Sequence, residues 1–109
     1  MNSITVGGKD RPVNVGWGML KEFGKLTGRT FGQVFEVSDL TFDDIEKLLF
    51  AGLKWGAKRE GQEFDVKLKD VGEWLDEDIN VVSEFMVMFQ EELTASLDEK
   101  NVPAPEAGQ

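Results

Sequence analysis

The chain has 109 residues, of which 40% are hydrophobic, and its 12 basic and 21 acidic side chains give a formal net charge of −9. This length and apolar content predict one small domain with a modest core, and they exclude disorder across the whole chain. The sequence contains no cysteine and no histidine, which excludes a disulfide framework and a thiolate metal site.

Charge and hydropathy also limit the partners and the location. Binding to a phosphate backbone depends on Lys and Arg, so a net charge of −9 favours solubility or a basic partner over nucleic acid. No apolar stretch approaches the length of a membrane span, and no basic leader precedes an apolar run. We therefore expect a cytoplasmic protein that binds neither nucleic acid nor membrane.

The first elements in chain order are two short strands, expected at Ser3–Val6 and Pro12–Val15. Between them, the sequence Gly7-Gly8-Lys9-Asp10 suits a tight turn, because glycine reaches positive φ without a Cβ clash. Pro12 has no backbone N–H to donate, so its strand should lie at a sheet edge or begin there. The N-terminus therefore predicts a β-hairpin.

Two helical segments are expected next. Apolar residues recur at helical spacing from about Trp17 to Thr27, and Gly28 suits the left-handed residue that ends a helix. The segment Phe31–Phe35 fits either a single helical turn or an extended strand, and we interpret it as a short helix.

Thr41 opens the clearest helix of the chain. Thr41 and Asp44 have the spacing of a capping box, with Asp in place of the usual Glu. Apolar residues continue at helical spacing, and Gly52 and Gly56 lie on that face, where another helix could approach closely. The polar segment 59–64 is expected to be a loop.

Two more helices complete the predicted domain. Asp65 is expected to cap a helix over Val66–Asp76, and the acidic segment Asp76–Asp78 to cap a last helix that runs to about Leu97. Residues 99–109 are expected to be a flexible tail, which leaves 1–98 as one domain. The predicted fold class is mainly α (α+β), with four or five short helices and an N-terminal β-hairpin.

Patterns that usually carry chemistry are incomplete in this chain. The segment Asp76–Asn80 begins like a calcium loop, but Val81 and Val87 stand where the required glycine and bidentate Glu belong. Gly24-Lys25 begins like a phosphate loop, but Leu26 replaces the Ser or Thr that must follow the lysine. Without histidine, Ser and Thr lack their usual activating base. We therefore predict no catalytic residue, metal or cofactor, and no enzyme activity.

The last helix carries two apolar stripes. The stripe expected to face the core consists of Ile79, Val82, Met86, Phe89, Leu93 and Leu97. The second stripe, which consists of Val81, Phe85 and Met88, lies about 100° around the helix. Either this helix is buried on several sides, or the second stripe contacts another molecule, for which adaptable Met and large Phe side chains are suited.

Phe50 also lies off the core face of its helix. The predicted partner-binding residues are Phe50, Val81, Phe85 and Met88. Among the tryptophans, we expect Trp74 in the core and leave Trp17 and Trp55 open.

Four segments resemble one known family. They are the hairpin Ile4-Thr-Val-Gly-Gly-Lys, the helix Trp17–Gly28, the helix Phe42–Leu53 and the segment Val71-Gly-Glu-Trp-Leu-Asp76. In this order they resemble the small tail assembly chaperones of long-tailed bacteriophages, over about residues 3 to 97. The motifs reflect packing, so the resemblance assigns no catalytic residue.

This resemblance implies a factor that binds the long, apolar, helical tape-measure protein and keeps it soluble while the tail tube polymerises. It further implies self-association, action in the cytoplasm of an infected host and absence from the finished virion. Two other functions remain open from the sequence: a structural head- or tail-joining subunit, and an acidic inhibitor that mimics DNA.

Overall fold

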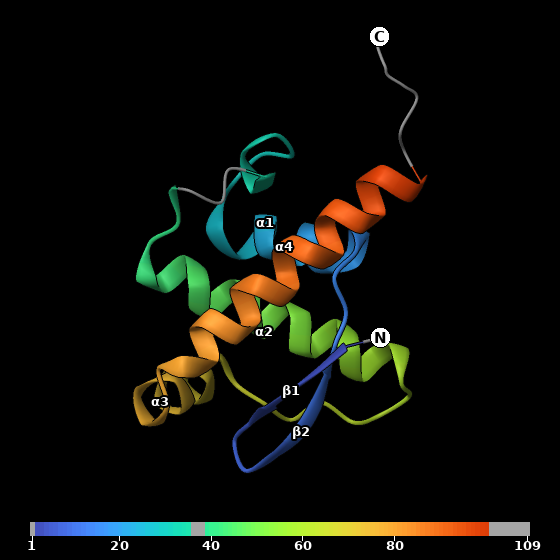
Figure 1. The fold of residues 1–109 in the computed structure, drawn as a ribbon. Helices are drawn as coiled ribbons and strands as arrows, with labels where there is room; N and C mark the ends of the chain where they lie inside the picture. The colour runs from blue at the N-terminus through green and yellow to red at the C-terminus, as the bar shows by residue number, and fades with distance from the viewer. Residues whose placement is uncertain (1, 36–38, 101–109) are drawn as a thin grey trace, which may run out of the picture.

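A computed structural model describes residues 2–35 and 39–100 (Figure 1). Its elements in chain order are β1 (Asn2–Val6), β2 (Lys9–Val13), α1 (Trp17–Thr27), the short 3₁₀ helix η1 (Gln33–Phe35), α2 (Phe42–Arg59), α3 (Leu68–Glu77) and α4 (Asn80–Lys100). The predicted fold class is confirmed, because the described residues form four α-helices and an N-terminal antiparallel hairpin.

The hairpin turns more tightly than predicted. Gly7 and Gly8 form the whole turn, with φ of 65° and 84°, and Val6 pairs with Lys9. A two-residue turn with positive φ at both positions matches the twist of the strands. The second strand therefore begins at Lys9, so the predicted boundary at Pro12 is wrong. Pro12 pairs with Ser3 in this two-stranded sheet, where each strand is an edge and the missing N–H is tolerated.

Helix α2 lies at the centre of the fold and contacts α1, β2 and α3. The predicted capping box is confirmed: the Asp44 N–H donates to Thr41 Oγ1 and the Thr41 N–H donates to Asp44 Oδ2, each at 3.1 Å. The close approach predicted along its glycine face exists, but the neighbour is strand β2. A Cβ built on Gly56 would lie 2.1 Å from the Pro12 carbonyl oxygen. Beside it, the Asn14 N–H donates to the Gly52 carbonyl at 3.1 Å.

The start of α3 differs from the prediction, whereas the start of α4 agrees with it. Helix α3 begins at Leu68, and the Asp70 carboxylate accepts from the Lys67 N–H at 2.9 Å, so the predicted cap at Asp65 is wrong. The predicted acidic cap of α4 is confirmed at Asp78, which accepts from the Asn80 N–H at 3.1 Å. Helix α4 continues to Lys100, and the rest of the predicted tail, 101–109, lies outside the described residues.

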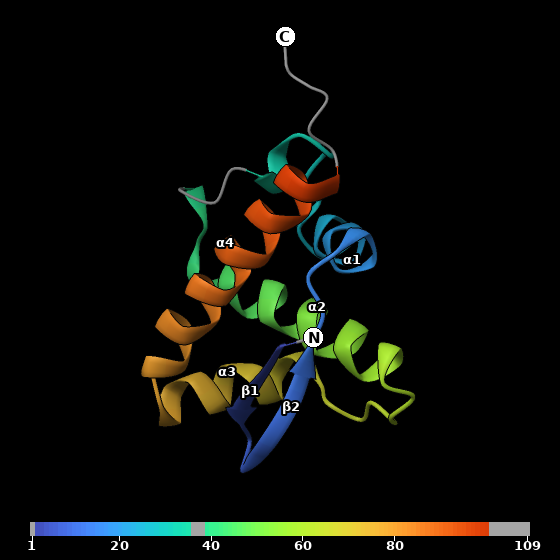
Figure 2. The same cartoon turned by 45° about the vertical axis from the view of Figure 1, so that its right-hand side comes forward.

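Helix α4 crosses in front of α2, and strand β1 of the hairpin contacts α4 (Figures 1 and 2). The first and last described elements therefore enclose one core with α1 and α2. Its largest fully buried side chains are Phe23, Phe85, Phe89, Met19, Leu48, Leu49, Leu53, Val13 and Val71.

Trp74, which was expected in the core, is half-buried and covers the hairpin turn. A Cβ on Gly7 would lie 2.5 Å from the Trp74 ring. Arg11, which belongs to β2, places its guanidinium 4.6 Å from the centroid of the same ring. Arg11 also donates to the Val6 carbonyl at 2.9 Å. The indole therefore joins α3 to the hairpin.

Candidate functional site

The four predicted partner-binding residues do not form one exposed patch. Val81 and Phe85 are core residues, with only 3% and 0% of their surface exposed. Phe50 and Met88 are half-buried against the same core, and the Phe50 ring meets Phe64 edge-on at a centroid distance of 5.5 Å. The expectation of an accessible second stripe is therefore wrong for Val81 and Phe85.

The core face of α4 combines residues of both stripes, so the expected burial is confirmed for Phe89 and the helix is buried on more than one side. Val81, Phe85 and Phe89 point into the core, whereas Ile79, which begins the stripe expected to be buried, is 75% exposed. Val82, Met86 and Leu93 from that stripe are half-buried, and the side chain of Leu97 lies outside the described residues. Val81, Phe85 and Phe89 have helical spacing, but so does the stripe that was expected to be buried, so spacing alone does not select this face.

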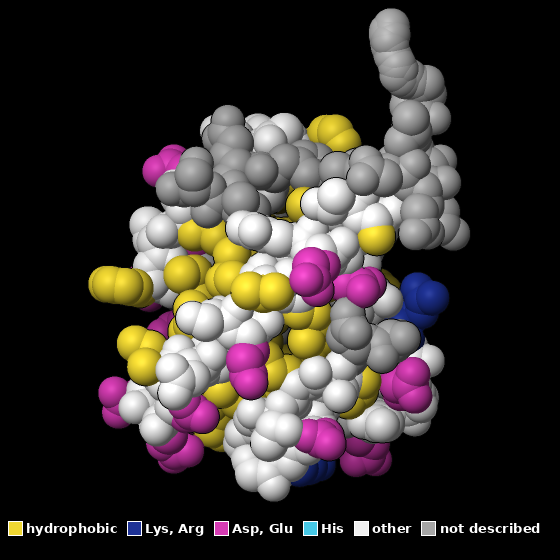
Figure 3. Space-filling model, in the orientation of Figure 1, with side chains coloured by type: hydrophobic (Ala, Val, Ile, Leu, Met, Phe, Trp, Pro, Cys, Tyr) yellow, Lys and Arg dark blue, Asp and Glu magenta, His cyan; other side chains and the backbone are white. Residues whose placement is uncertain are grey.

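The first exposed apolar surface lies where α2 and α4 begin and α3 ends. Phe42 is 89% exposed there, beside a hollow of about 390 Å³. We call this surface the acidic face; its residues are Phe42, Ile45, Glu46, Gly72, Leu75, Asp76, Ile79 and Val82. In Figure 3, hydrophobic side chains gather over the starts of α2 and α4, and carboxylates lie around them.

Backbone and charge contacts fix the geometry of the acidic face. Helix α3 lies against α2 at Gly72, where a Cβ would lie 3.1 Å from Glu46 Oε2. Phe42 is exposed because it follows Thr41 directly and is the first residue of α2. Arg29 Nη2 lies 2.6 Å from Asp44 Oδ2, and both side chains are largely buried, so this ion pair ties the end of α1 to the start of α2.

Burial acts to raise the pKa of the Asp44 carboxyl, but the hydrogen bond from the Thr41 backbone and the nearby Arg29 guanidinium outweigh it. The pKa of Asp44 is therefore lower than its usual value. The carboxylate stays ionised and holds both the helix start and the arginine.

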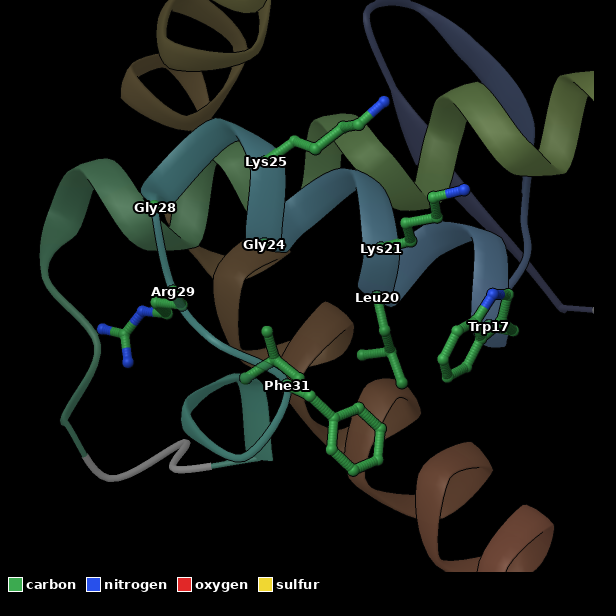
Figure 4. A pocket seen from close by; sticks show the side chains of 9 residues that line it. Trp17, Leu20, Lys21, Gly24, Lys25, Gly28, Arg29 and Phe31 are labelled. Carbon is green, nitrogen blue, oxygen red and sulfur yellow. The ribbon is translucent and has the colours of Figure 1, made fainter.

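The second exposed apolar surface lies between α1 and η1 and encloses a hollow of about 440 Å³. We call it the basic groove; its residues are Trp17, Leu20, Lys21, Gly24, Lys25, Gly28, Arg29, Phe31 and Val34. The Trp17 and Phe31 rings lie 6.0 Å apart and are tilted by 44°, and these side chains are 70% and 67% exposed. In Figure 4, Leu20 extends from α1 toward Phe31, whereas the Lys21 and Lys25 side chains point away from Phe31.

The rims of the two surfaces carry opposite charge. Lys21 and Lys25 are exposed, and within residues 2–35 and 39–100 neither forms an ion pair; Arg29 is already bound to Asp44. Glu46 and Asp76 are the charged residues that line the acidic face. Sequence reasoning missed both surfaces, because their apolar residues come from different elements.

Reactive groups do not gather at either surface. Among the described residues, no three His, Cys, Asp or Glu side chains lie close enough together to hold a metal ion. In the same part of the chain, no helix is long and apolar enough to cross a membrane. Both surfaces can therefore bind by apolar and charge contacts, and neither brings together a nucleophile and a base.

Searches against protein-family models, curated proteins and solved structures found no match to this chain.

Proposed function

We propose that the protein is a phage tail assembly chaperone that binds apolar helical segments of the tape-measure protein through its acidic face. The observation that carries this proposal is the exposure of Phe42 and Ile79 around one apolar hollow. Large apolar side chains grouped in this way on a small chain mark a surface that another molecule covers. The family resemblance of the sequence supports the same function and supplies the kind of client.

The geometry suits a helical client. A helix that presents apolar residues at three- and four-residue spacing can place them against Phe42, Ile79 and the half-buried Val82. Glu46 and Asp76 at the rim favour clients with Lys or Arg beside the apolar stripe. Full burial of one such side chain is worth about 1.5–3 kcal/mol, so one contact is weak and many copies along an extended client give strong binding.

The net charge of −9 supports the same proposal. A chaperone that displays apolar surface must resist clumping with its own copies and with other proteins. Like-charged copies repel one another at long range, which keeps the free protein dispersed.

The test is co-expression with the tape-measure protein of the same phage, with the soluble fraction of that client as the measurement. We expect Ile79→Asp to lower the apparent affinity about tenfold or more, because a charge replaces a contact worth about 1.4 kcal/mol or more. The matched control is Val87→Asp, which places the same charge on an exposed residue of α4 outside the acidic face. If the Ile79 variant protects the client as well as the control does, the acidic face is not the binding site.

A further inference from the structure

The hairpin has two outer edges, and helix α2 covers the edge that belongs to β2. At the end of β2, the Asn14 N–H donates to the Gly52 carbonyl of α2 at 3.1 Å. Two residues earlier, the Pro12 carbonyl lies against Gly56 of α2, where a Cβ would be only 2.1 Å from its oxygen. These alternate residues of the strand therefore direct their backbone groups away from β1 and toward the helix.

The register then fixes which groups lie at the outer edge of β1. Pro12 pairs with Ser3, and Asp10 pairs with Thr5. In an antiparallel ladder, pairs that bond each other alternate with pairs whose groups point outward on both sides. Ser3 and Thr5 therefore present their N–H and C=O groups on the side away from β2. Within residues 2–35 and 39–100, no residue outside the hairpin forms a hydrogen bond with these groups.

A hollow of about 630 Å³ lies along this edge, between β1 and α4. Its lining includes Ser3, Ile4 and Thr5, three consecutive residues of the strand. Successive side chains of a strand point to opposite faces, so a space that reaches all three lies beside the edge. In Figure 1, β1 lies between β2 and α4. The residues that α4 adds to the lining are Ser83, Glu84, Val87, Met88 and Glu91.

The sequence of β1 does not protect this edge. Natural edge strands are protected by charged side chains, proline or bulges, which prevent pairing with another chain. Strand β1 has the sequence Asn-Ser-Ile-Thr-Val, without a charged residue or a proline, and its residues pair with β2 one to one. An edge of this kind can accept a further strand.

We propose that an extended, basic segment of another protein adds to β1 as a third strand. The outward groups of Ser3 and Thr5 bond its backbone, which a helix cannot offer because its own backbone groups are already paired. Val87, 57% exposed, meets its apolar side chains. Glu84 and Glu91 favour Lys or Arg in the segment and repel the same carboxylates of a second copy. The site is separate from the acidic face, so the inference goes beyond the proposed function.

The experiment uses the full chain and a short fluorescent peptide of alternating valine and lysine, with anisotropy as the measure of affinity. When extended, this peptide has one apolar and one basic face. Ser3→Pro removes an outward N–H but no bond of the ladder, as Pro12 does on the opposite strand. We expect it to bind the peptide about tenfold or more weakly than Ser3→Ala, which loses the same hydroxyl and keeps the N–H.

A second measurement requires no variant. Amide hydrogen exchange of the wild type, followed by NMR, should slow about tenfold or more at Ser3 and Thr5 when the peptide is bound, because both N–H groups become hydrogen-bonded. Exchange at Asp10, on the opposite edge of the hairpin, should stay unchanged.

Charge variants test the preference for a basic segment. Glu84→Lys with Glu91→Lys should weaken binding about threefold or more, since two exposed charge pairs are lost. Glu73→Lys with Glu77→Lys makes the same change in net charge at exposed residues outside the hollow, and it should have a smaller effect. Ile79→Asp, which disrupts the proposed client site, should leave the peptide affinity close to that of the wild type, so the two proposals fail separately.

Three results would overturn the inference. They are a wild type that does not bind the peptide, equal affinities of the two Ser3 variants, and unchanged exchange at Ser3 and Thr5 in the bound state. A wild type that sediments as a dimer and becomes monomeric with Ser3→Pro would also overturn it, because a second copy would then occupy the edge.

Discussion

Gly56 is the residue at which strand β2 comes closest to helix α2. Its missing side chain leaves the space that the Pro12 backbone occupies, since a Cβ would lie 2.1 Å from the Pro12 oxygen and 2.8 Å from the Val13 nitrogen. Both neighbours are backbone atoms, which cannot rotate away as a side chain does. The position of the hairpin on α2 therefore depends on this glycine.

We expect Gly56→Ala to lower the free energy of unfolding by about 3 kcal/mol or more, because forced backbone shifts outweigh the roughly 1 kcal/mol by which alanine favours a helix. Urea denaturation measures the change. The control is Gly32→Ala, where a Cβ would meet nothing within 4 Å and φ is not in the left-handed range. Equal stability of the two variants would show that β2 does not pack as described.

Asp44 links stability to pH. Burial acts to raise the pKa of this carboxyl, but the hydrogen bond from the Thr41 backbone and the Arg29 guanidinium outweigh it, so its pKa in the folded protein is lower than usual. The stability that it contributes is therefore complete above the unfolded pKa and is lost as the pH falls through the lower folded pKa.

We expect Asp44→Asn to remove the loss of stability at low pH that comes from protonation of Asp44. Thermal unfolding between about pH 6 and pH 2 should show the wild type more stable than the variant at the upper end, with the difference shrinking as the pH falls through the acidic range. The control is Asp43→Asn at the neighbouring exposed position of the same first turn. A difference that is constant across the whole range would contradict the role of the Asp44 charge.

At the scale of elements, helix α4 shows how a core face is selected. Its buried residues Val81, Phe85 and Phe89 recur every four positions, and Phe85 and Phe89 lie 6.2 Å apart between ring centroids. Strand β1 and helix α3 both contact this helix. The face that meets those neighbours is the one that becomes buried.

We expect Phe85→Ala to lower the free energy of unfolding by about 3–5 kcal/mol, because it leaves a cavity in the core. Val87→Ala, two residues along the same helix, should change it by only about 0.5 kcal/mol or less because Val87 is largely exposed. Chemical denaturation of both variants separates the buried face of the helix from its exposed face. A small effect at Phe85 would contradict the burial of this side chain in the core.

The elements themselves could be predicted from local signals. Gly28 ends α1 with φ of 77°, and the Thr41–Asp44 box begins α2, as their sequence patterns indicate. The segment at Phe31–Phe35 forms a helical turn, as interpreted. Each of these features depends on residues within a few positions of one another, which is the range that a sequence pattern describes.

Local sequence signals could not predict which face of α4 is buried, nor could they predict the two exposed apolar surfaces. Both stripes of α4 are apolar, so periodicity alone does not say which one meets β1. Phe42 and Ile79 come from the starts of different segments, and they share a hollow because α3 packs against α2. Trp17 and Phe31 likewise meet through the turn that follows Gly28.

At the scale of the whole molecule, the exposed apolar side chains of the acidic face belong to a chain whose net charge is −9. The proposed client meets these side chains beside Glu46 and Asp76, so the charge of the client affects how strongly it binds.

We expect a helical peptide with an apolar stripe flanked by lysines to bind the chain. A peptide of the same apolar pattern flanked by glutamates is the control, and it should bind far more weakly to a face that carries Glu46 and Asp76. Calorimetric titration measures the affinity of each peptide. Equal affinities would show that these two carboxylates do not take part in client binding.

The contact between β1 and α4 has a consequence for how the protein is made. Ile4 and Val6 are synthesised well before the helix that helps to bury them, which starts at Asn80. At typical rates of translation, this interval lasts several seconds. During that time the nascent hairpin has no α4 to cover it, so this part of the core closes only after α4 has been synthesised.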